Sequence, residues 1–75
     1  MTDAVIDAID LVAQDDGPEA AAKQAAHELG VETALAELSG VVNGAFGARH
    51  DRLAAVLSEV RKLKRDGEQA TEVEA

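Results

Sequence analysis

Residues 50–65 read His-Asp-Arg-Leu-Ala-Ala-Val-Leu-Ser-Glu-Val-Arg-Lys-Leu-Lys-Arg, and this stretch decides the fold. Its large apolar residues recur every three or four positions, at Leu53, Val56, Leu57, Val60 and Leu63. That spacing is typical of an amphipathic helix, because a strand would alternate its faces every second residue. Basic residues gather in the last turn, where they suit the negative end of the helix dipole, and Gly67 follows as a stop signal. We therefore expect a helix over 50–65 with a buried apolar stripe.

We expect three further helices before it, over residues 2–14, 18–29 and 33–43. In the first, Ile6 and Ile9 lie opposite a stripe of aspartates, which is helical periodicity. Pro18 suits the first position of the second helix, whose body is almost all alanine. Gly30 is placed to end that helix in a left-handed conformation. The third segment carries Leu35 and Leu38 at helical spacing.

These segments predict an all-α protein, a small bundle of about four helices. Residues 1–67 would form a single helical domain, and the polar, acidic residues 68–75 would form a flexible, disordered C-terminal tail. Only 19 apolar side chains larger than alanine are present in 75 residues, so the core is thin. We expect modest stability or help from self-association, a common route for small chains without disulfides or metals.

The glycines between the last two helices leave their connection open. The large apolar residues from Leu35 to Leu63 keep an average spacing of about 3.5 residues, which would suit one long bent helix. Gly40, Gly44 and Gly47 weaken that helix, and a break within 43–50 would make two separate helices instead. The same three glycines form either a hinge or a face on which another backbone packs closely.

Composition excludes several classes of function. The chain has no cysteine, which rules out disulfides, thiolate metal sites and cysteine nucleophiles. Its longest apolar run, 53–57, is far shorter than the roughly 18 residues that span a bilayer, and no signal peptide is recognised at the start. We expect a cytoplasmic protein without a membrane partner.

Charge is distributed in bands along a chain whose net charge is −8. Residues 1–48 hold nine acids and one base, residues 49–65 hold six bases and two acids, and residues 66–75 hold four acids. Most of this surface would repel a polyanion. The banding is compatible with head-to-tail attraction between copies or with the tail folding back on the basic segment. It is equally typical of a solvated acidic surface, which would also suit a protein in high salt.

No catalytic, metal or cofactor site is expected, and we predict that the protein is not an enzyme. His27 and His50 each stand beside one acid, but neighbours on a helix do not face each other. No ligands are spaced to converge on a metal. Ser39 and Ser58 have no base at a suitable spacing.

Residues 24–39 resemble a helix-turn-helix. Ala26, Leu29, Gly30 and Val31 match the small and apolar positions of that family around its turn. The resemblance implies a DNA-binding regulator, with the following segment as the recognition helix. That segment offers two glutamates and no Lys or Arg, although phosphate contact supplies most non-specific DNA affinity. Nucleic acid is thus not the expected partner, and DNA binding is the alternative function.

The function we expect is protein–protein interaction or assembly, through self-association into a homo-oligomer. The apolar seam of residues 50–65 would be the contact surface, with more apolar residues upstream. The expected interface comprises Leu53, Val56, Leu57, Val60, Leu63, Leu35, Leu38, Val42 and Phe46. The charge bands would set the orientation of the partners.

Overall fold

The computed structural model describes the backbone of residues 3–74 and the side chains of residues 4–67. In this part of the chain the structure is all-α, with no strand. Its helices are α1 (Asp3–Asp16), α2 (Pro18–Leu29), α3 (Val31–Gly44) and α4 (Gly47–Glu74). The predicted bundle of about four helices is confirmed, and the bounds of α2 agree with the prediction at both ends.

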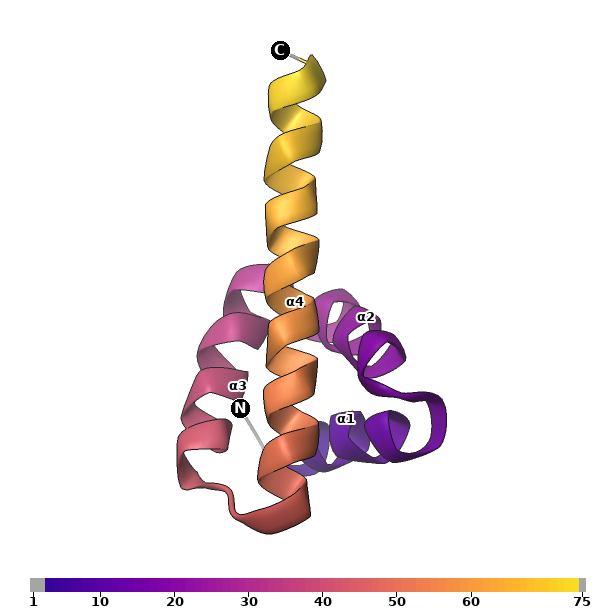
Figure 1. The fold of residues 1–75 in the computed structure, drawn as a ribbon, viewed down its shortest axis with the longest axis vertical. Helices are drawn as coiled ribbons and strands as arrows, with labels where there is room; N and C mark the ends of the chain where they lie inside the picture. The colour runs from indigo at the N-terminus through magenta and orange to yellow at the C-terminus, as the bar shows by residue number, and fades with distance from the viewer. Residues whose placement is uncertain (1–2, 75) are drawn as a thin grey trace.

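The four helices are arranged around α4 (Figure 1). Helix α3 lies on one side of α4 and runs antiparallel to it, α2 lies on the other side, and α1 crosses behind the base of α4. The most extensive contact is between α3 and α4, while α2 packs against each of the other three helices. The far end of α4 extends beyond the other helices (Figure 1).

Single glycines connect the first three helices. Gly17 alone separates α1 from α2, and Gly30 alone separates α2 from α3. Both adopt a positive φ, 94° and 83°, with ψ near extended values, a combination that is essentially restricted to glycine. The Gly30 N–H donates to the Ala26 carbonyl (2.9 Å), and the Gly30 carbonyl accepts from the Ala34 N–H (2.9 Å). The backbone thus turns sharply while both flanking helices stay hydrogen-bonded. The predicted positive φ at Gly30 is confirmed, although its ψ is not that of a left-handed helix.

Helices α3 and α4 are separate. The chain breaks at Ala45–Phe46, within the predicted window, and turns back on itself, so residues 33–65 do not form one bent helix (Figure 1). Helix α4 begins at Gly47, three residues before the predicted start, and Gly67 does not stop it. The acidic tail predicted for 68–75 falls outside the residues whose side chains are described, and it stays a prediction.

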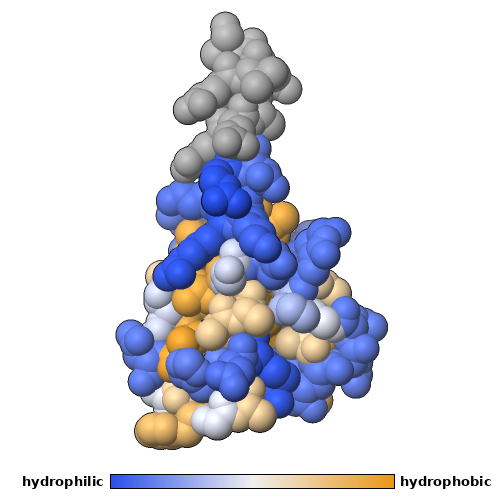
Figure 2. Space-filling model, viewed as in Figure 1, coloured by the Kyte–Doolittle hydropathy of each residue, from blue (hydrophilic) through white to orange (hydrophobic). Residues whose placement is uncertain are grey.

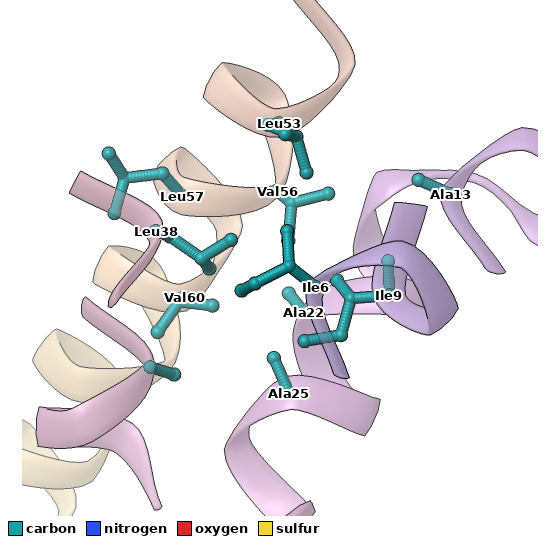
Figure 3. Packing of buried hydrophobic residues seen from close by; sticks show 12 residues of the cluster. Ile6, Ile9, Ala13, Ala22, Ala25, Leu38, Leu53, Val56, Leu57 and Val60 are labelled. Carbon is teal, nitrogen blue, oxygen red and sulfur yellow. The ribbon is translucent and has the colours of Figure 1, made fainter. Parts of the chain in front are cut away.

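The core joins apolar side chains of α4 to those of the other three helices (Figure 3). Leu38, Leu57 and Val60 lie on one side of it and Ile9 and Ala13 on the other, with Val56 between them (Figure 3). Helix α2 contributes only alanines among its fully buried residues, Ala21, Ala22 and Ala25, each 0% exposed. Because alanine projects little from a helix, α2 can approach its neighbours closely, and the larger residues of α1, α3 and α4 fill the core.

Candidate functional site

The apolar seam of α4 belongs to the intramolecular core. Leu53, Val56 and Val60 are 0% exposed and Leu57 is 6% exposed within a single chain. Leu38 of α3, predicted for the same interface, is also 0% exposed. The side chains at 0% exposure pack within the core, so a partner cannot touch them while the bundle is folded, and Leu57 reaches the surface only at the edge of a cleft between α3 and α4. The expected use of this seam as an intermolecular contact is corrected accordingly.

The remaining predicted interface residues lie at the edge of the core or outside it. Leu35, Val42 and Leu63 are partly buried and pack against the core. Phe46 is 86% exposed. The predicted interface therefore consists of buried residues, partly buried residues and one exposed side chain.

Within one chain, no other helix of the described residues packs on the predicted glycine face. Gly40, Gly44 and Gly47 are exposed, and a Cβ placed on any of them would meet no atom within 4 Å. No other helix of the described bundle approaches them. Gly44 and Gly47 instead flank the break between α3 and α4, where Gly47 has φ +64°. The hinge interpretation fits these two positions, and Gly40 lies inside α3.

Two aspartate–arginine pairs fasten α1 to the start of α4. Arg52 donates from Nε to Asp10 Oδ1 (2.9 Å) and from Nη2 to Asp10 Oδ2 (3.2 Å), and Gln14 Nε2 also donates to Oδ2 (3.2 Å). Asp10 is only 5% exposed. Arg49 donates to Asp7 Oδ1 from both terminal nitrogens at 3.2 Å, nearer the solvent. The acidic band of α1 is thus neutralised in part by the basic band of α4 within one chain.

The Arg52 guanidinium sets the ionisation of Asp10. Its hydrogen bonds lower the pKa of the Asp10 carboxyl below the usual value, although burial acts in the opposite direction. The same hydrogen bonds raise the pKa of Arg52. Sequence reasoning treated Asp10 as part of a solvated stripe. The available signal was the matching three-residue spacing of Asp7 and Asp10 and of Arg49 and Arg52.

Phe46 stands on the two-residue turn between α3 and α4. The Ala45 N–H donates to the Val42 carbonyl (3.2 Å), and the Phe46 carbonyl accepts from the His50 N–H (3.4 Å). The backbone of the turn is thereby anchored to both helices while the Phe46 ring faces solvent. Phe46 is also the only aromatic residue of the chain.

A small apolar groove lies between α1 and α2. Its volume is about 210 Å³, and it is lined by Ala4, Val5, Ala8, Ile9, Gln24 and Glu28. Gln24 Nε2 donates to Glu28 Oε1 (2.8 Å) along the α2 side. We call this feature the α1–α2 groove. Sequence reasoning missed it because Ala4 and Ala8 are small and were not singled out.

A second cleft lies between α3 and α4 and is basic. It measures about 310 Å³ and is lined by Leu35, Ser39, Leu57, Arg61, Lys64 and Arg65. Lys64 also forms an ion pair with Glu32 of α3 (3.1 Å). Figure 2 shows apolar surface between α3 and α4, below the hydrophilic side chains of the upper part of α4. Such a cleft can contact acidic groups of a partner over an apolar floor.

The other predicted features bring no site together. His50 Nδ1 lies 3.3 Å from Asp51 Oδ1, closer than expected for helix neighbours, but both side chains are exposed. Over the residues described, no three His, Asp or Glu side chains are grouped to hold a metal ion. None of the helices within residues 3–74 is both long and apolar enough to cross a membrane.

The helix-turn-helix resemblance maps onto α2 and α3. Their connection is Gly30 alone, and α3, the would-be recognition helix, carries Glu32 and Glu37 and no basic residue. The two helices pack against each other as a corner of the bundle.

Comparison with known proteins adds no relative. No protein-family model, no curated protein and no solved structure matches this chain.

Proposed function

We propose that this protein is a non-enzymatic assembly component that binds protein chains, including other copies of itself. Its contact surface would be the exterior of the bundle around the α3–α4 turn. We also propose that the protein is cytoplasmic, as its composition leads us to expect.

The exposure of Phe46 carries the proposal. A phenylalanine that is 86% exposed forgoes the free energy of burial, about 1.5–3 kcal/mol for a side chain of this size. Aromatic residues are enriched at protein interfaces and among the residues that dominate binding energy. In a chain with a thin core and one aromatic residue, the ring is placed where it serves a partner better than the fold.

The charge distribution supports a protein partner rather than nucleic acid. The cationic side chains of the α3–α4 cleft occupy one side of a chain whose net charge is −8. A basic cleft on an acidic body favours particular orientations of an acidic protein surface, because complementary charge mainly improves specificity and association rate. No Tyr or Trp is present for stacking on nucleic-acid bases.

The mass of the protein in solution tests the proposal. Sedimentation equilibrium from micromolar to millimolar protein, at physiological ionic strength to screen the net charge, should show a mass that rises above 7.8 kDa. A mass that stays at 7.8 kDa throughout this range would contradict self-association.

Retention on duplex DNA provides the opposing measurement. The proposal predicts no retention at low salt. Retention that falls steeply as salt is added would favour the helix-turn-helix alternative instead.

A further inference from the structure

We propose that Phe46 of one copy inserts into the α1–α2 groove of a second copy. This inference rests on the proposed function and names the contact by which self-association occurs. Both halves of the contact are present on every chain: the exposed aromatic ring lies on the α3–α4 turn, and the apolar groove lies between α1 and α2.

The groove is large enough for a phenyl ring. A buried apolar cavity of about 150 Å³ accepts benzene, and the α1–α2 groove measures about 210 Å³. Two alanines, Ala4 and Ala8, leave room above Ile9, which is 1% exposed and forms part of the floor. The phenyl ring would therefore meet methyl and methylene groups, with the Gln24–Glu28 hydrogen bond at the edge.

The surface beside the groove is also apolar. The described side chains include two large apolar residues that are exposed, Phe46 and Leu11, and Leu11 is 58% exposed. Ala4, Ala8 and Leu11 follow the i, i+4, i+7 spacing, so they share one face of α1. A docked turn would cover Leu11 as well as fill the groove.

Charge complements this pairing. Residues 4–29, which build the groove, contain six acids and one base, whereas residues 47–65, which follow Phe46, contain six bases and two acids. Arg49 and Arg52, the bases nearest Phe46 in the sequence, are already paired with Asp7 and Asp10 of their own chain. The attraction between copies would therefore come from other acids of residues 4–29, such as Asp15 and Asp16, and from bases further along α4, such as Arg61 and Arg65. A second copy suits the groove because every chain presents an exposed phenyl ring together with these bases.

The contact is heterologous, since the turn of one copy meets a different surface on the next. Each copy keeps its own turn and its own groove for further contacts, so the assembly either closes into a ring or extends. One ring in one groove is a small interface, and we expect association that is weak and depends on concentration.

Two surface variants separate the halves of the contact. Phe46→Ala removes the ring, and Ala8→Lys places a long charged side chain in the groove. Each should weaken self-association by about tenfold to a hundredfold, as expected for loss of one buried phenylalanine. Asn43→Ala, near the same turn, and Ala36→Lys, an exposed alanine of α3 that does not line the groove, are the matched controls and should associate like wild type. Far-UV circular dichroism should show the same helicity in all five proteins.

Mixing the two weakened variants gives the decisive measurement. The Phe46→Ala protein still has a groove and the Ala8→Lys protein still has a ring, so their mixture should form a one-to-one dimer that neither forms alone. Sedimentation of the mixture at millimolar protein measures this directly.

Each outcome has a distinct meaning. Wild-type protein that remains a monomer overturns both this inference and the proposed function. Wild-type protein that associates while Phe46→Ala associates equally well overturns the inference and leaves the proposed function standing. Weakened variants whose mixture stays monomeric also overturn the ring-in-groove contact.

Discussion

The apolar seam of α4 and the turn at Phe46 carry large apolar side chains with the same spacing in the sequence, but their environments in the structure are opposite. Val56 and Val60 are 0% exposed, whereas Phe46 is 86% exposed. All three residues lie on one apolar stripe when the sequence is counted at helical spacing. The stripe predicts a common face only while the helix is continuous, and the break at Ala45–Phe46 ends that continuity. Apolar residues before and after a break therefore need not share a surface.

Placing a charge in the apolar seam of α4 should unfold the protein. Val60→Glu buries a carboxylate without a partner at a position that is 0% exposed. We expect complete loss of the folded bundle, since small domains have little stability to lose. Far-UV circular dichroism and thermal unfolding measure this. Ser58→Glu, an exposed position of the same helix, should fold normally, and a folded Val60→Glu monomer would contradict the described core.

Replacing a buried leucine and an exposed leucine by alanine makes the same chemical change in two different environments. Leu38→Ala should lower the free energy of unfolding by about 2–5 kcal/mol, because Leu38 is 0% exposed and its loss leaves a cavity. Leu11→Ala, at a position 58% exposed, should change it by less than about 0.5 kcal/mol. Urea denaturation at low protein concentration gives both values. Equal effects at the two positions would mean that the burial is wrongly assigned.

Asp10→Asn tests the contribution of the Asp10–Arg52 ion pair to the packing of α1 against α4. Losing the charged acceptor for Arg52 and Gln14 should lower the free energy of unfolding by about 1–3 kcal/mol at neutral pH. The pKa of Asp10 is lowered in the folded state, so its stabilisation is present above the unfolded value near 3.9 and is lost as pH falls through the folded value. The difference in free energy of unfolding between wild type and Asp10→Asn should thus be constant near neutral pH and decrease in acid, as urea denaturation at several pH values would measure.

The more exposed pair provides the control for this effect. Asp7→Asn should have a smaller effect on stability, because the Asp7 side chain is 58% exposed and screened by solvent. If the difference in free energy of unfolding between wild type and Asp10→Asn did not decrease in acid, the described ion pair would be contradicted.

The smallest expected effect lies on the exposed side of α3. Gly40→Ala should raise the free energy of unfolding by about 0.5–1 kcal/mol, since alanine is the better helix former and its Cβ would meet no atom within 4 Å. Thermal unfolding measures the change. Destabilisation instead would show that another backbone approaches this glycine closely.

Much of the fold was predictable because local signals set it. Periodicity, Pro18 and the glycines located the helices, including both ends of α2. Periodicity identifies which face of α4 is apolar but not which element covers it, so the seam was assigned to a partner that turned out to be the chain's own helices. Asp10 has the spacing of a solvated residue, and only its Arg52 partner, 42 residues away, explains its burial. Contacts across such separations depend on topology, which local patterns do not specify.

The single-residue corners at Gly17 and Gly30 also determine where a protease can cut. Proteolytic nicking concentrates at exposed loop tips, and neither corner offers a loop. The longest stretch between the described helices is Ala45–Phe46, and it holds an exposed phenylalanine, the kind of residue that a chymotrypsin-like specificity pocket accepts. Limited digestion should therefore cleave first after Phe46 and separate α4 covalently from the three helices that cover its seam.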